Sequence, residues 1–180
     1  MRSVINLNLQ RRVLMQDIFK INGEEEFLKG LELLNSNEQW GLRKALGYFC
    51  IAAEKGHNEA IFQVGYLSLF GMPQIAQNVS KAVECFKISA ESGLVIAKYY
   101  LAECYLSGIG IEKNEQLAIE LFQETLKLGY FWSADRLSDI YKYGIGIESD
   151  RDKALEYNGY ARQARLPNAE FKYLGLILGR

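Results

Sequence analysis

The chain has 180 residues, of which 49% are hydrophobic, and its formal net charge is −1. This length suits one domain or a short array of repeats, and the apolar content argues against disorder. The near-zero charge argues against non-specific nucleic-acid binding, which requires a basic surface. Because the chain has a single histidine, metal and catalytic sites that need two histidines are excluded, and we expect no cofactor and no metal. No run of about 18 apolar residues occurs, so we expect no membrane insertion.

Residues 1–23 form a segment of their own. Asn6, Asn8 and Gln10 interrupt its apolar residues, so no cleaved secretion signal is expected and a cytoplasmic location is predicted. The apolar residues between 13 and 19 fit a helix. We therefore interpret the segment as an N-terminal cap, which the end of a repeat array requires.

From residue 24 onward, one pattern returns every 36 or 37 residues. Three features recur at this spacing. They are an alanine followed by aromatic residues, a glycine after those aromatic residues, and a second glycine about 15 residues after the first. The alanines are Ala45, Ala82, Ala118 and Ala154, and the glycines are Gly56, Gly93 and Gly129 and then Gly71, Gly108 and Gly144. A fixed period of this length predicts a stack of repeated units.

Each period has the pattern of two helices. Apolar residues between 97 and 105 fall at helical spacing, and Gly108-Ile109-Gly110 ends that helix because glycine adopts the left-handed conformation of a C-terminal cap. Asn114 is placed to cap the next helix, and Asp150 or Asp152 does the same one unit later. The predicted units are 24–57, 58–94, 95–130 and 131–166, followed by a terminal helix at 167–178.

This pattern resembles the Sel-1-like repeat family, a relative of the tetratricopeptide repeats. The resemblance covers residues 24–178 and is strongest in the unit with Leu101-Ala102, Tyr105, Gly108, Gly110, Ile111, Ala118 and Phe122. It implies an all-α fold, a right-handed α-solenoid of antiparallel helix pairs with about four repeats plus terminal caps. Two departures are a longer loop with Pro73 and an arginine, Arg165, in a glycine position.

Several residues of types that often bind metals or take part in catalysis have structural explanations. His57 lies at a turn between two predicted helices, where we expect a turn or cap role, and Glu24, Glu25 and Glu26 suit a solvated helix start. The three cysteines form no CxxC pair, which argues against a zinc site or a disulfide framework and favours small buried residues in a reducing compartment. These cysteines are Cys50, Cys85 and Cys104.

The resemblance also implies where a partner binds, because the first helix of each pair lines the concave groove of tetratricopeptide-type arrays. Carried onto this sequence, the groove residues are Glu59, Tyr66 and Phe70, then Tyr99, Glu103 and Leu106, then Trp132, Asp135, Asp139, Lys142 and Tyr143. For Phe62, Leu69 and Tyr99, burial between helices is the alternative, whereas exposure is predicted for Trp132 and Tyr143. Asp135 and Asp139 share one helix face, where pairing with Arg136 or Lys142, solvation and neutralisation by a partner remain open.

The resemblance implies a non-enzymatic adaptor that binds another protein in its groove, and the acidic residues favour a basic segment. A narrower form is a bacterial immunity protein that neutralises a toxin. The alternatives are a hydrolase or cell-wall-related enzyme of the same family, and a self-assembling scaffold that pairs through residues 174–178. We expect a monomer or a weak homodimer.

Overall fold

The computed structural model describes residues 22–35, 40–72 and 75–164. Most of the expected N-terminal cap, the loop residue Pro73, Arg165 and the expected helix at 167–178 lie outside the described residues. Within them the chain forms eight helices and no strand. These helices are α2 (Glu24–Leu34), α3 (Gly41–Glu54), α4 (Asn58–Phe70), α5 (Val79–Glu91), α6 (Val95–Ser107), α7 (Glu115–Lys127), α8 (Trp132–Tyr143) and α9 (Arg151–Ala164).

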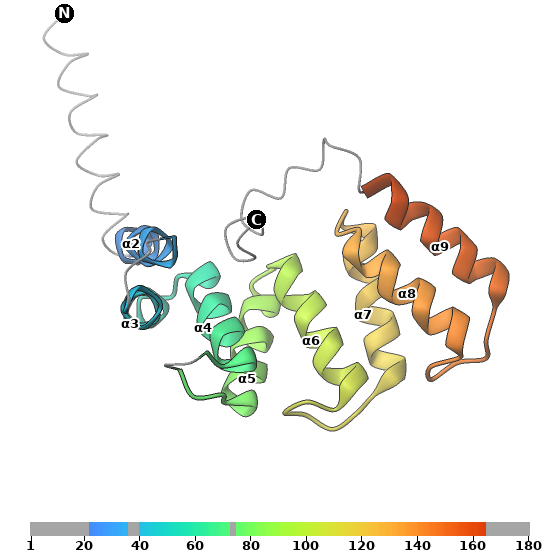
Figure 1. The fold of residues 1–180 in the computed structure, drawn as a ribbon, viewed down its shortest axis with the longest axis horizontal. Helices are drawn as coiled ribbons and strands as arrows, with labels where there is room; N and C mark the ends of the chain where they lie inside the picture. Colours follow the sequence, from blue (N-terminus) through green and yellow to red (C-terminus); the bar gives the residue numbers. More distant parts are fainter. Residues whose placement is uncertain (1–21, 36–39, 73–74, 165–180) are drawn as a thin grey trace, which may run out of the picture.

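The helices are arranged in chain order across the molecule (Figure 1). Each helix packs mainly against the helix before it and the helix after it, so the pairs α2–α3, α4–α5, α6–α7 and α8–α9 stack side by side. This is the all-α solenoid that the repeat pattern predicts. None of the described helices is both long enough and apolar enough to cross a membrane.

The helix ends follow the repeated turn residues. The side-chain oxygens of Asn78, Asn114 and Asp150 each accept the backbone N–H of the residue three positions on, at 3.0 Å in all three cases. These bonds satisfy donors that the first turn of a helix leaves open, so the caps expected at Asn114 and Asp150 are confirmed. At the other end, Gly108 and Gly144 stand as left-handed C-caps of α6 and α8.

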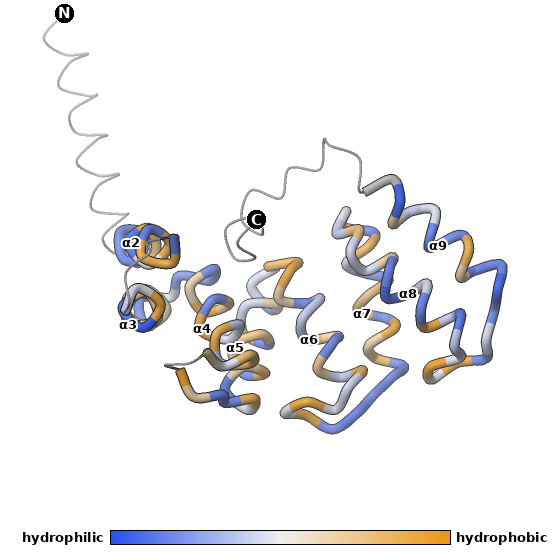
Figure 2. The backbone as a smooth tube through the Cα atoms, viewed as in Figure 1, coloured by the Kyte–Doolittle hydropathy of each residue, from blue (hydrophilic) through white to orange (hydrophobic). Residues whose placement is uncertain are grey.

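The core lies between neighbouring helices, both within pairs and between them, and repeats with the pairs. Phe49, Phe86 and Phe122 occupy the same position in successive units and are fully buried. Phe49 and Phe86 each pack against a glycine on the first helix of their own pair. A Cβ added to Gly30 or Gly65 would lie within 3.0 Å of the phenylalanine ring, so no larger residue fits there without a shift of its surroundings. Hydrophobic residues accordingly recur along α4, α6 and α7, whereas α9 is predominantly hydrophilic (Figure 2).

Candidate interaction surface

The helices α4, α6 and α8 are the first helices of three successive pairs, and they form one side of the molecule, here called the first-helix face. The ring of Tyr66 on α4 meets that of Tyr100 on α6 edge-on, with centroids 5.4 Å apart. One unit on, Glu103 of α6 contacts Arg136 of α8. Direct contact between these helices makes the first-helix face a continuous surface.

A depression of about 300 Å³ opens on this face across all three helices. Its walls are mainly aromatic and aliphatic, with one ion pair. It is lined by Leu69, Phe70, Tyr99, Tyr100, Glu103, Cys104, Ser107, Ile109 and Arg136. A concave apolar site with few polar groups suits a side chain of a bound partner.

The ion pair in this depression has a fixed geometry. Arg136 donates from Nε to one carboxylate oxygen of Glu103 at 2.6 Å and from Nη2 to the other at 3.0 Å. Partial burial acts to lower the pKa of Arg136, but the Glu103 carboxylate outweighs this effect and raises it. A two-point arginine–carboxylate pair is more directional than a single contact, so it holds α6 and α8 in register.

Tyrosines surround the depression and stay neutral. Burial raises the pKa of Tyr99, Tyr100 and Tyr130 well above the ordinary value for a phenol. Tyr99 and Tyr100 meet edge-on at 5.4 Å between centroids. These residues therefore act as a rigid aromatic wall whose hydroxyls remain protonated at physiological pH.

Exposure divides the aromatic residues that the sequence assigns to the groove. Phe70, Trp132 and Tyr143 are 53%, 42% and 65% exposed, as predicted for the last two. Tyr66 is buried, as are Phe62 and Leu69, and Tyr99 is half-buried. Tyr66 therefore shapes the depression from beneath and offers a partner little surface.

The remaining groove residues differ in exposure. The charged residues Glu59 and Asp139 are exposed, whereas Asp135, Glu103 and the apolar Leu106 are half-buried. Lys142 is exposed and donates to the Tyr143 hydroxyl at 2.9 Å, with its Nζ 4.6 Å from the centre of that ring. Arg136, one of the two cations expected beside Asp135 and Asp139, forms its two-point pair with Glu103.

Sequence reasoning did not assign five lining residues of the depression to the groove, and two of them, Tyr100 and Arg136, are related by the repeat. They stand 36 residues apart and so occupy the same position in consecutive units. Both contact the first helix of the preceding unit, Tyr100 at Tyr66 and Arg136 at Glu103. The repeat period could have revealed this position, had the contact between consecutive first helices been considered.

His57 has a structural environment. Its Nδ1 accepts the backbone N–H of Ala60 at 3.3 Å, which caps α4, and its Nε2 lies 2.9 Å from a carboxylate oxygen of Glu24. The ring stacks on Phe27 at 4.4 Å between centroids. The predicted cap role is confirmed. The acidic start of α2 is also confirmed, but Glu24 contacts His57 and Glu26 contacts Lys55, so these two carboxylates are not simply solvated.

Comparison with known proteins identifies the repeats. The sequence profile of the Sel1 repeat matches residues 39–57, 58–94, 95–130 and 133–157. The chain belongs to the Sel1 repeat family. Sel1 repeat proteins are generally protein-interaction adaptors. The described residues contain no cluster of metal-binding side chains.

Solved structures share the Sel1 fold. A Sel1 repeat protein from Oxalobacter formigenes is 27% identical, with a TM-score of 0.66 over 79% of this chain and 57% of that one. The Escherichia coli protective antigen c5321, which has an SLR fold, is 22% identical, with a TM-score of 0.50 over 87% and 41%. Pseudomonas aeruginosa PA5086 is 18% identical, with a TM-score of 0.55 over 78% and 53%. This chain therefore spans about half the length of these proteins.

Proposed function

We propose that the protein is a non-enzymatic adaptor that binds a segment of a partner protein on the first-helix face. The observation that carries this proposal is the depression across α4, α6 and α8, with exposed Phe70 at its edge. Aromatic residues contribute much of the binding energy of protein interfaces, and a preformed pocket lowers the entropy cost of binding.

The lining of the depression suggests the chemistry of the partner. Its aromatic wall suits one apolar or aromatic anchor side chain. The acidic side chains Glu59 and Asp139 are exposed on the helices that form the first-helix face. Opposite charges across an interface guide association, so we propose a partner segment that combines an apolar anchor with basic neighbours.

A test compares the wild-type chain with two variants in affinity capture from the native cell, followed by titration of the captured partner. Phe70→Ala combined with Tyr143→Ala removes two exposed aromatic residues from the proposed surface and should weaken binding at least tenfold. The control is Trp40→Ala, because Trp40 is 51% exposed at the start of α3 and lies off this surface. A partner that the double variant binds as tightly as wild type would refute the proposal.

A narrower form of the proposal makes this chain an immunity protein that neutralises a toxin in the bacterial cytoplasm. The three cysteines form no disulfide, which agrees with a reducing compartment. The test is co-expression with the protein encoded by the neighbouring gene, with cell survival as the measurement. Survival that does not depend on this chain would reject the narrower form while leaving the adaptor proposal standing.

A further inference from the structure

The outer side of α9 has the features of a surface that receives another helix. Leu155 is 63% exposed, although the residues at the same position of the two preceding units, Val83 and Ile119, are 4% and 2% exposed. Val83 is covered by α6 and Ile119 by α8, each the first helix of the following pair. Leu155 therefore stands where the repeat pattern expects a further first helix.

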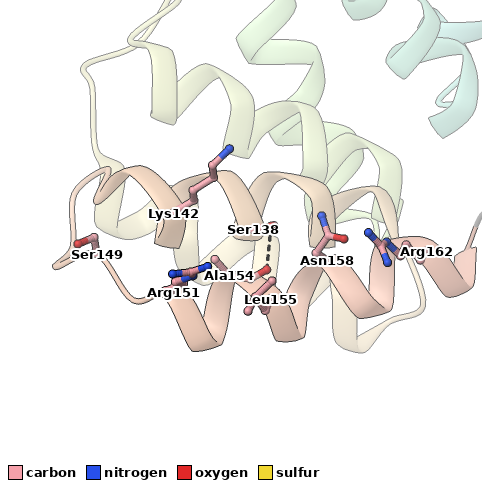
Figure 3. A pocket seen from close by; sticks show the side chains of 8 residues that line it. All are labelled: Ser138, Lys142, Ser149, Arg151, Ala154, Leu155, Asn158 and Arg162. Atoms are coloured by element: carbon pink, nitrogen blue, oxygen red, sulfur yellow. Dashed lines mark hydrogen bonds between the residues drawn. The ribbon is translucent and has the colours of Figure 1, made fainter.

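A depression of about 580 Å³ adjoins Leu155 between α8 and α9 (Figure 3). Asn158, in its wall, occupies the position that Phe49, Phe86 and Phe122 fill in the other units. On its floor, the Ser138 hydroxyl donates to the carbonyl of Ala154 at 2.8 Å. The last pair thus lacks the large aromatic residue of its predecessors and leaves space beside an exposed leucine.

We propose that residues 167–178 of the same chain form the next first helix and pack on this surface of α8 and α9. The proposal shares one residue with the proposed partner-binding function, Asp139, which the new helix would contact, and does not otherwise depend on it. Its first support is the position of the segment, which begins soon after Ala164 and is rich in apolar residues.

The repeat step assigns contacts to this segment. Ala169, Tyr173 and Leu176 lie 36 residues after Ser133, Leu137 and Ile140, all three of which are buried. Leu137 and Ile140 pack on α7, so Tyr173 and Leu176 would pack on α9. Tyr173 is larger than the leucine at its equivalent position, which suits the space left by Asn158.

The same step assigns an ion pair. Glu103 and Arg136 join α6 to α8, and 36 residues after each stand Asp139 and Lys172. Asp139 is exposed on α8. A helix in the predicted register would place the Lys172 ammonium opposite this carboxylate, so charge and apolar pattern indicate the same register.

One residue of the segment provides a matched control. Leu174 lies 36 residues after Ser138, which shares its position with Gly65 and faces the second helix of its own pair. In the proposed helix Leu174 would therefore face away from α9. Leu176→Asp and Leu174→Asp introduce the same chemical change on opposite sides of one segment.

The experiment is hydrogen exchange of the full-length chain, read helix by helix. Leu176→Asp should speed the exchange of α9 amides about tenfold, while Leu174→Asp leaves it within a factor of about two of wild type. The amides of α4 and α5 serve as an internal control for folding, because solenoid units contact only their neighbours. Equal effects of the two variants, or no effect of Leu176→Asp, would overturn the proposal.

An exchange of the charges at Asp139 and Lys172 tests the register independently, and it places no charge in an apolar contact. Asp139→Lys should speed α9 exchange, and adding Lys172→Asp should restore it, whereas adding Lys87→Asp on α5 should not. Restoration by both second changes would overturn the register. Protection of α9 that rises with protein concentration, together with a dimer in light scattering, would assign the surface to a second copy and overturn the intramolecular proposal.

Discussion

At the level of single residues, glycine serves two different purposes in this fold. A Cβ added to Gly65 would lie 2.8 Å from Cβ of Cys85 and 3.0 Å from the ring of Phe86, so this glycine permits two helices to approach closely. Gly47 is exposed inside α3, and outside its chain neighbours and the nearby backbone of its own helix no atom lies within 4 Å of where its Cβ would be. The same residue type is therefore required at one position and dispensable at the other.

This contrast predicts opposite outcomes for the same substitution. Gly65→Ala should lower the free energy of unfolding by about 1–3 kcal/mol, because the added methyl group overfills the helix contact. Gly47→Ala should raise it by about 0.5–1 kcal/mol, because alanine favours the helix interior. Urea unfolding followed by circular dichroism measures both, and a loss of stability in Gly47→Ala would contradict the explanation.

Three phenols with raised pKa values predict sensitivity to alkali. Burial raises the pKa of Tyr99, Tyr100 and Tyr130 in the folded chain, while in the unfolded chain these groups titrate near about 10. Their contribution to stability is therefore complete below that pH. It is lost as the pH rises above it, because only the unfolded chain releases the protons.

The urea midpoint should accordingly fall between pH 9 and pH 11 and stay level between pH 7 and pH 9, measured at constant ionic strength. Tyr100→Phe should make the fall shallower, since it removes one of the three hydroxyls whose pKa is raised. The buried thiol of Cys104, whose pKa burial raises to about 11, adds to the same trend. A midpoint that does not change up to pH 11 would show that these phenols titrate normally in the folded chain.

At the level of helices, the His57 ring joins two helices, α2 and α4. It caps α4, contacts Glu24 at the start of α2 and stacks on Phe27 of that helix. We expect His57→Ala to cost about 1–2 kcal/mol, because the cap and the ring contact are both lost. His57→Asn should recover part of this loss, since asparagine caps helices well. Thermal unfolding compares the three chains, and an asparagine variant no more stable than the alanine variant would show that the cap contributes little.

The helices themselves could be predicted from sequence because their limits are local. Asn114 and Asp150 cap helices through bonds to residues three positions away, and Gly108 and Gly144 end them by backbone conformation. The contact of Glu24 with His57 spans 33 residues and depends on how α2 sits on the start of α4. No local signal carries that information, so sequence reasoning assigned Glu24 to solvent.

For the molecule as a whole, stability should be local. Phe86→Ala should cost about 3–5 kcal/mol, because the ring is fully buried. The resulting increase in hydrogen exchange should be largest in α4, α5 and α6 and smallest in α9, since contacts run between neighbouring helices. Ile88→Ala, at a half-exposed position of the same helix, is the control and should change stability by less than about 0.5 kcal/mol. A uniform increase across all helices would instead indicate a single cooperative unit.

The period predicted the solenoid because four units repeat the same small and large residues in phase. The candidate surface was less predictable, since its residues differ from unit to unit. Trp132 and Tyr143 could be placed on it by counting from the repeat, but the burial of Tyr66 depends on Tyr100, a residue of the next unit. Side-chain exposure in a stacked array is thus decided by pairs of units, and a pattern within one unit does not contain it.

The contacts between consecutive first helices also constrain how such a chain could be rearranged. The step from α4 to α6 is made by two tyrosines, whereas the step from α6 to α8 is made by an acid and a base. Exchanging the α4–α5 and α6–α7 units would place Tyr66 opposite Arg136. The Glu103 carboxylate would then lie beside α4 and would lose Arg136 as its partner. Such a permutation would separate these side chains from their matched neighbours. The order of the units is therefore encoded at their junctions, and an engineered copy of one unit would need its junction residues rewritten to match its new neighbours.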